Sequence, residues 1–235
     1  MAMVEMYYMT IDPGGEELGP AILALLPEEK RERLGRTIRR DDRNRLAWGG
    51  ILLGHLVALR TGQPFPAVAF GRSETGKPFL REPAGVHFNL AHSGRLIVAA
   101  LSASPVGVDV EEIGPVDSPA ATAGTFMSEK ELRLFMRGSG EERLAFFYRV
   151  WTAKESFIKC TGEGFSADPR RLSVTFGKGG ISIRRDNSVA GSWSFREYSI
   201  DSGYSVCACS AGIRDFAAAR EILQGDILRH LRDPS

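Results

Sequence analysis

The chain has 235 residues, of which 43% are hydrophobic and 25% charged, and its formal net charge is +1. This composition is typical of a globular protein with one large domain or two small ones. The near-zero net charge excludes strong overall attraction to nucleic acid or to an anionic membrane, so we expect neither as a partner.

Hydropathy and cysteine content exclude further classes of protein. No stretch approaches the roughly 20 apolar residues that span a bilayer, and the first ten residues lack the pattern of a signal peptide. The chain has an odd number of cysteines, namely Cys160, Cys207 and Cys209, and no two of them have Cys-x-x-Cys spacing. That pattern argues against a disulfide framework and a cysteine zinc site. We therefore expect a reduced, cytoplasmic protein.

Helices dominate the first 62 residues. An apolar and aromatic run predicts a strand over residues 4–11, and residues 16–26 are compatible with a helix. Pro27 then begins a helical region that is densely basic over residues 30–45 and apolar over residues 46–59. Its predicted end is at Thr61-Gly62, because glycine is favoured just past a helix end.

Helices and short strands then alternate in two blocks. Short strands are predicted first, with turn residues between them, over residues 86–90, 96–101 and 106–110. One helical stretch follows over residues 128–161. Strands are predicted again over residues 172–176, 181–184, 192–198 and 204–209, and a last helix over residues 214–231. This order favours an α+β fold with two halves, residues 1–104 and 105–235.

The strand at residues 106–110 carries two acidic side chains on one face. Val108 and Val110 point to the core, so Asp109 and Glu111 point together to the other face, which we expect to meet solvent. Two carboxylates about 7 Å apart along one strand face can share a divalent cation. The alternative is an ordinary solvated strand face.

The helix that ends near residue 161 has a lysine within its apolar stripe. Lys154 must pair with an anion or extend to solvent, because an unpaired buried charge is very costly. Glu155 and Lys159 lie at the edge of the stripe, four residues apart on one helix face. A simple surface ion pair explains Glu155 and Lys159, but it does not explain Lys154. The stripe consists of Phe147, Val150, Trp151, Phe157 and Ile158.

Three shorter motifs complete the pattern. Residues 88–94 place His92 and a Ser-Gly turn at a strand end, where an anion can bind or the histidine can be incidental. Gly76-Lys77-Pro78 is a turn that leaves a lysine on a loop. Ser128 and Glu131 have the spacing of a helix capping box.

These motifs, in this order, resemble the broad-specificity, surfactin-synthetase-activating type of 4′-phosphopantetheinyl transferase. The matching segments are residues 76–78, 88–93, 107–111, 126–131 and 151–162. The resemblance covers roughly residues 20–210, and its most specific part is the Trp-x-x-Lys-Glu segment that begins at Trp151. One position departs from the family pattern, which usually has serine where this chain has Ala91.

The resemblance implies a pseudo-twofold fold of two similar α/β halves, with coenzyme A and Mg²⁺ or Mn²⁺ in the cleft between them. It implies transfer of the phosphopantetheine arm of coenzyme A to a serine of an apo carrier protein by a monomeric enzyme. The implied metal ligands are Asp109, Glu111 and Glu155. Glu155 would also accept the serine proton, and Lys159 would stabilise the departing 3′,5′-ADP. The implied contacts to coenzyme A phosphates are Arg33, Arg72, Lys77 and His92, with Lys30 and Arg45 beside them.

Two other functions are compatible with parts of this pattern. A carrier-binding module that lost its chemistry would have a broken carboxylate set, whereas Asp109, Glu111 and Glu155 are all present together with Lys159. A different Mg²⁺-dependent enzyme acting on nucleotides would need its own phosphate loop. The sequence has neither a Walker loop nor a Gly-x-Gly-x-x-Gly motif.

Overall fold

The computed structural model describes residues 2–15, 17–65, 68–82, 85–186, 188–189 and 191–232. The first half contains β1 (Glu5–Thr10), α1 (Pro20–Leu23), α2 (Glu28–Arg36), α3 (Arg40–Thr61), β2 (Phe70–Arg72), β3 (Pro78–Leu80), β4 (His87–Ser93) and β5 (Leu96–Ser102). The second contains β6 (Val106–Glu112), α4 (Pro119–Phe126), α5 (Glu129–Arg137), α6 (Gly140–Thr161), the short 3₁₀ helices η2 (Gly164–Ser166) and η3 (Pro169–Arg171), β7 (Leu172–Gly177), β8 (Gly180–Arg185), β9 (Ser188–Val189), β10 (Trp193–Glu197) and β11 (Tyr204–Ala211). The chain then continues into β12 (Arg220–Glu221) and α7 (Gln224–Arg232).

The two halves repeat one order of elements. Each has a first strand, β1 or β6, and later a helix of 22 residues, α3 or α6. A short hairpin follows, β2–β3 or β7–β8, to which the second half adds the two-residue strand β9, and then come two strands of the main sheet. The last strand of each half, β5 or β11, pairs antiparallel between the other two, which gives the orders β1-β5-β4 and β6-β11-β10. The expected α+β fold of two similar halves is therefore confirmed.

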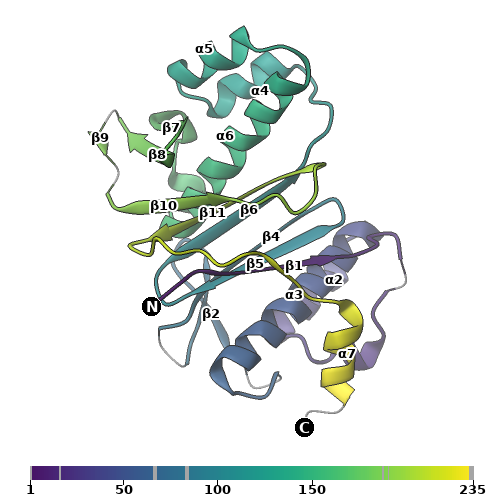
Figure 1. Cartoon of the computed structure of the whole chain (residues 1–235). Coiled ribbons are helices and arrows are strands. Elements are labelled where there is room, and N and C mark those ends of the chain that lie inside the picture. Colours follow the sequence, from purple (N-terminus) through teal and green to yellow (C-terminus); the bar gives the residue numbers. More distant parts are fainter. Residues whose placement is uncertain are drawn as a thin grey trace.

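The two sheets pack against each other, and each long helix covers an outer face (Figure 1). Alternation along β5 explains this layering. Leu96, Val98 and Ala100 enter a cluster shared with β6 and β11, whereas Ile97 and Leu101 on the opposite face pack in the cluster that contains α3. On the far side, residues of α6 pack against β11. Strands β5, β6 and β11 therefore have both faces covered. As a result, polar residues on either face of β6 can be buried.

Glycines end both long helices where the sequence predicts an end. Gly62 (φ 70°) and Gly162 (φ 77°) adopt the left-handed conformation, and each N–H donates to the carbonyl four residues earlier. The predicted single helix over residues 128–161 is wrong in one respect. It is divided into α5 and α6 by residues 138–139, and Gly140 begins α6 with a positive φ of 52°.

The C-terminal segment does not follow its helical pattern. The prediction of a helix over residues 214–231 is wrong, because residues 220–221 form β12, which pairs parallel with β1, and helix α7 begins only at Gln224. Pairing satisfies backbone groups along the open edge of β1, and this tertiary contact overrides local propensity. Ile227 of α7 is fully buried in the core beneath α3, so this segment returns to the first half.

The structure also tests the predicted helix over residues 16–26 and the expected absence of a membrane-spanning helix. In the predicted helix over residues 16–26, only Pro20–Leu23 is helical, and Glu16 lies outside the described residues. Among the described residues, no helix combines the length and apolar character needed to cross a membrane.

Candidate active site

A cavity of about 420 Å³ is lined by residues of both halves. Strands β4 and β6, one from each half, run beside each other (Figure 1). The walls of the cavity come from α2, α3 and the β2–β3 hairpin on one side and from β6 and α6 on the other. Most of the predicted site residues line it. They are Lys30, Arg33, Arg72, His92, Asp109, Glu111, Glu155 and Lys159.

Asp109 is the most deeply buried carboxylate of this cavity, with only 4% of the residue exposed. The expectation that it faces solvent is wrong, because α6 covers this face of β6. Its Oδ1 accepts a hydrogen bond of 2.6 Å from Lys159 Nζ, and its Oδ2 is buried without a partner. Burial raises the pKa of Asp109 to about 7, although Lys159 opposes the shift.

Glu111 and Glu155 stand beside Asp109 and are less buried. Glu111 accepts hydrogen bonds from Ser93 Oγ at 3.0 Å and from Trp151 Nε1 at 3.2 Å, so both its oxygens are oriented. Burial raises the pKa of Glu155, and the charge of Lys159 partly offsets this. Sequence reasoning assigned Trp151 only to the apolar stripe. Its four-residue spacing from Glu155, which places both on one helix face, is the signal that indicates its second role.

Carboxylates are the type of ligand that a hard divalent cation prefers, but the three in this cavity do not already form a metal-binding cluster. Within the described part of the chain, no three His, Cys, Asp or Glu side chains gather closely enough to hold a metal ion. Asp109, Glu111 and Glu155 nevertheless line one cavity, and Asp109 Oδ2 has no partner. Mg²⁺ usually binds one or two carboxylates and takes its other ligands from substrate phosphates and water. The three carboxylates therefore fit a metal that arrives with a phosphorylated substrate.

Cationic side chains also line the cavity, together with Glu29, which pairs with Arg72. Lys30 lies over Gly50, where an added Cβ would be 3.0 Å from Lys30 Cδ, so a larger residue there would displace the lysine. Burial and the charges of Arg33 and Arg72 together lower the pKa of Lys30 to about 8. Burial and the nearby Arg45 likewise lower the pKa of His92. Glu29 offsets part of this repulsion, and an anion bound between these cations would relieve the rest.

Two predicted phosphate contacts lie outside the cavity lining. Arg45 donates to the carbonyl of Gly94 at 2.9 Å and pairs with Asp42 at 2.6 Å, so its guanidinium is already engaged. Lys77 Nζ donates to the carbonyls of Cys160 at 3.0 Å and Val106 at 3.3 Å. Neither side chain is among those that line the cavity, and the contacts of Arg45 and Lys77 with phosphates stay predictions. Ala91, in contrast, does line the cavity and is buried.

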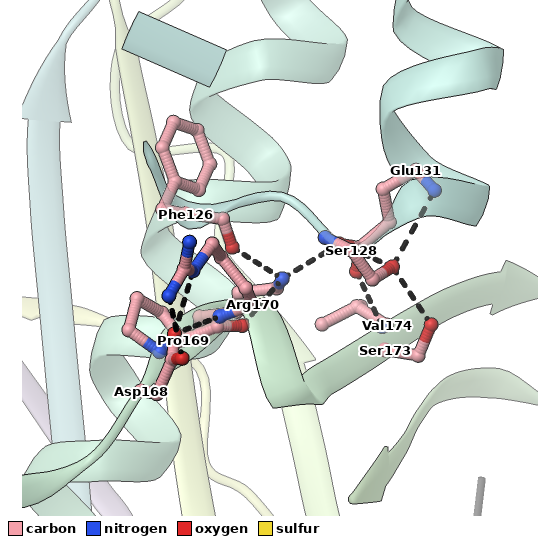
Figure 2. A network of polar contacts seen from close by, with 9 residues as sticks. Phe126, Ser128, Glu131, Asp168, Pro169, Arg170, Ser173 and Val174 are labelled. Carbon is pink, nitrogen blue, oxygen red and sulfur yellow. Dashed lines mark hydrogen bonds and ion pairs between the residues drawn. The ribbon is translucent and has the colours of Figure 1, made fainter. Parts of the chain in front are cut away.

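The lysine in the apolar stripe is explained by a buried ion pair behind the site. Lys154 and Glu131 have 1% exposed side chains, and Lys154 Nζ lies 2.6 Å from Glu131 Oε2. The same ammonium donates to the carbonyls of Phe126 and Pro169. Figure 2 shows the network around Glu131, which also caps α5 through Ser128. The predicted capping box is confirmed, and of the two alternatives for Lys154 the structure has the ion pair rather than extension to solvent. Together these contacts join α5, α6 and β7.

A cavity lined by both carboxylates and cations is suited to a phosphorylated substrate and a divalent cation. Comparison with known proteins identifies the family. Residues 105–209 match the family model of the 4′-phosphopantetheinyl transferase superfamily, and residues 12–104 match that of the 4′-phosphopantetheinyl transferase N-terminal region.

Relatives match over most of the chain. A 4′-phosphopantetheinyl transferase of Bacillus subtilis is 32% identical over 84% of this chain and 86% of its own length. The transferase psf-1 of Bacillus pumilus is 32% identical over 77% of this chain and 76% of its own. The transferase Sfp of Bacillus subtilis is 29% identical over 85% and 88%. The chain therefore belongs to the 4′-phosphopantetheinyl transferase superfamily, and it is an enzyme that transfers phosphopantetheine to carrier proteins.

Proposed function

We propose that the donor is coenzyme A, that the reaction depends on Mg²⁺, and that 3′,5′-ADP is released. One observation carries this proposal: a single cavity is lined both by the carboxylates Asp109, Glu111 and Glu155 and by the cations Lys30 and Arg33. A pyrophosphate with a separate terminal phosphate, as in coenzyme A, has the charge distribution that such a cavity complements.

The reaction is a displacement at phosphorus. The carrier serine Oγ forms a bond to the β-phosphorus of coenzyme A, and the bond from that phosphorus to the oxygen of 3′,5′-ADP breaks. We assign Glu155 as the base that accepts the serine proton, directly or through a water. Burial raises its pKa, which makes this carboxylate a stronger base than an exposed glutamate. Lys159 lies at the same wall and stabilises the negative charge of the departing 3′,5′-ADP.

Asp109, Glu111 and Glu155 would hold Mg²⁺, or Mn²⁺ in its place, against the pyrophosphate. When bound, the ion would neutralise negative charge on the phosphoryl group under attack. The hydrogen bonds from Ser93 and Trp151 keep Glu111 oriented before the ion arrives. Lys159 must share Asp109 with the ion, because it already bonds Asp109 Oδ1 while Oδ2 is unpartnered.

The cations of the first half would hold the phosphates. We assign Lys30 and Arg33 of α2 to the terminal 3′-phosphate, and Arg72 and His92 to phosphates nearer the reacting centre. Residues 1–104 thus supply phosphate contacts, and residues 105–235 supply the carboxylates and the base. Since one chain contributes both walls, we propose that a monomer is active. A cytoplasmic location, where coenzyme A and apo carriers are available, completes the proposal.

The direct test is to incubate the enzyme with coenzyme A, Mg²⁺ and an apo carrier domain and to weigh the carrier by mass spectrometry. The carrier should gain one phosphopantetheine arm, and 3′,5′-ADP should appear in equal amount. EDTA or Glu155→Gln should abolish both products, whereas Lys178→Met, in the exposed β7–β8 turn, should not. A carrier that binds but gains no mass with any divalent ion would contradict the proposal.

A further inference from the structure

Lys77 lies in a tight turn whose geometry aims its side chain at the second half. In this turn between β2 and β3, Gly76 has a φ of 83°, and Ser73 N donates to the carbonyl of Lys77 at 2.9 Å. Ser73 Oγ in turn accepts a hydrogen bond from Lys77 N at 3.1 Å. The N–H and the carbonyl of Lys77 are thus both held, so the turn fixes where its side chain begins.

The ammonium group of Lys77 bonds two backbone segments of the second half. Nζ donates to the carbonyl of Cys160 at 3.0 Å and to that of Val106 at 3.3 Å. The stem packs on the helix end, since a Cβ added to Gly162 would lie 3.3 Å from Lys77 Cδ. The Lys77 side chain therefore extends from the β2–β3 turn of the first half to the main chain of the second half.

Both carbonyls belong to segments that carry reacting groups. Cys160 lies in the last turn of α6, where carbonyls lack partners within the helix and a cation is favoured. It directly follows Lys159. Val106 begins β6, three residues before Asp109. One ammonium group thus bonds the main chain next to both members of the Asp109–Lys159 pair.

The packing between α6 and β6 makes their relative position sensitive to this contact. A Cβ on Gly107 would lie 2.0 Å from the carbonyl oxygen of Ser156 and 2.4 Å from Cys160 N, so the helix rests directly on the strand. Such close packing of backbone on backbone makes the position of the α6 end relative to β6 sensitive to small shifts. Lys77 bonds both elements from the other half and thereby fixes the end of α6 along β6.

We propose that Lys77 is a positioning residue, which joins the first half to the end of α6 and the start of β6 and holds Lys159 and Asp109 in their catalytic arrangement. It is not a ligand of a coenzyme A phosphate. This inference rests on the proposed use of coenzyme A as donor. Wild-type enzyme that fails to transfer from coenzyme A would contradict that proposal. An active wild type with an unaffected Lys77 variant would contradict only this inference.

The test compares Lys77→Met, which keeps most of the stem and removes the ammonium, with Lys178→Met as a matched control. For Lys77→Met, kcat should fall roughly ten- to hundred-fold, because small misplacements of reacting groups have effects of that size. The Kd for coenzyme A, measured by calorimetry without a carrier, should change less than about two-fold. Amide hydrogen exchange should accelerate at residues 158–164. Lys178→Met should change none of these quantities.

Three outcomes overturn the inference. A Kd for coenzyme A that rises strongly while kcat is kept would make Lys77 a phosphate ligand. A lower melting temperature with kcat unchanged would make its role purely one of stability. The third outcome uses the wild type and applies even if Lys77→Met fails to fold. The ammonium resonance of Lys77 in ¹⁵N-lysine-labelled enzyme should keep its position when coenzyme A is added, and a large shift would refute the inference.

Discussion

The buried pair behind the site offers a stringent test of how α6 is anchored. Lys154→Met retains most of the apolar stem and removes the ammonium that bonds Glu131 at 2.6 Å. The carbonyls of Phe126 and Pro169 lose the same donor (Figure 2). The substitution therefore leaves one buried carboxylate without its cation and two carbonyls without a hydrogen bond.

The size of the effect follows from what remains around Glu131. Breaking a buried ion pair by removing one partner costs about 3–5 kcal/mol. Glu131 retains three donors, namely the N–H and hydroxyl of Ser128 at 2.7 and 2.9 Å and the N–H of Val174 at 2.6 Å. We therefore expect the lower end, about 3 kcal/mol. In a chain of this length, each kcal/mol shifts the melting temperature by about 2–4 °C, so a decrease of about 6–12 °C should follow.

Urea unfolding monitored by circular dichroism measures this free energy directly. Arg171→Met is the matched control, because Arg171 lies in the adjacent η3 and pairs with Asp186 at the surface, so its loss should barely move the midpoint. Adding Glu131→Gln to Lys154→Met should destabilise less than the two single changes summed, by at least about 1 kcal/mol. If Lys154→Met changes the unfolding free energy no more than Arg171→Met does, the pair does not anchor α6 and the reasoning is refuted.

The cavity residues give three further predictions. Asp109→Asn should reduce transfer roughly hundred-fold or more, because it removes a charge that organises the phosphoryl site. Its melting temperature should not fall, because burying that carboxylate is itself costly, and calorimetry of the metal-free protein checks this. Raising the pH from 7 to about 9.5 should weaken coenzyme A binding roughly ten-fold. The pKa of Lys30 in the free enzyme is about 8, and its cationic form, which binds phosphate, is lost above that value. The Lys30→Arg variant should lose the part of this pH dependence that comes from Lys30, because arginine stays charged. Titration calorimetry of coenzyme A binding at both pH values measures this. Arg33→Ala should raise KM for coenzyme A far more than for dephospho-coenzyme A, and equal effects in steady-state assays would remove Arg33 from the 3′-phosphate site.

Local patterns in the sequence were sufficient for much of the fold and for most of the site. Alternation over residues 106–110 predicted both the strand β6 and the shared face of Asp109 and Glu111, because side-chain direction along a strand is a local property. The capping box at Ser128 and the glycine at the end of α3 were equally local. The motifs also placed Glu155 and Lys159 on the cavity wall, since their helix and its spacing were correctly identified.

What the polar groups contact was decided only by the tertiary structure. Alternation indicates which face of β6 is apolar, but not that α6 covers the other face, so Asp109 was expected in solvent and is buried. Lys159 could reach Glu155 within its own helix, yet it bonds Asp109, which is 50 residues away in sequence. Lys77 was expected to face a phosphate and instead bonds carbonyls of the second half. A long, flexible cation takes whichever acceptors the packing of the two halves brings within reach, and that packing is not contained in local sequence patterns.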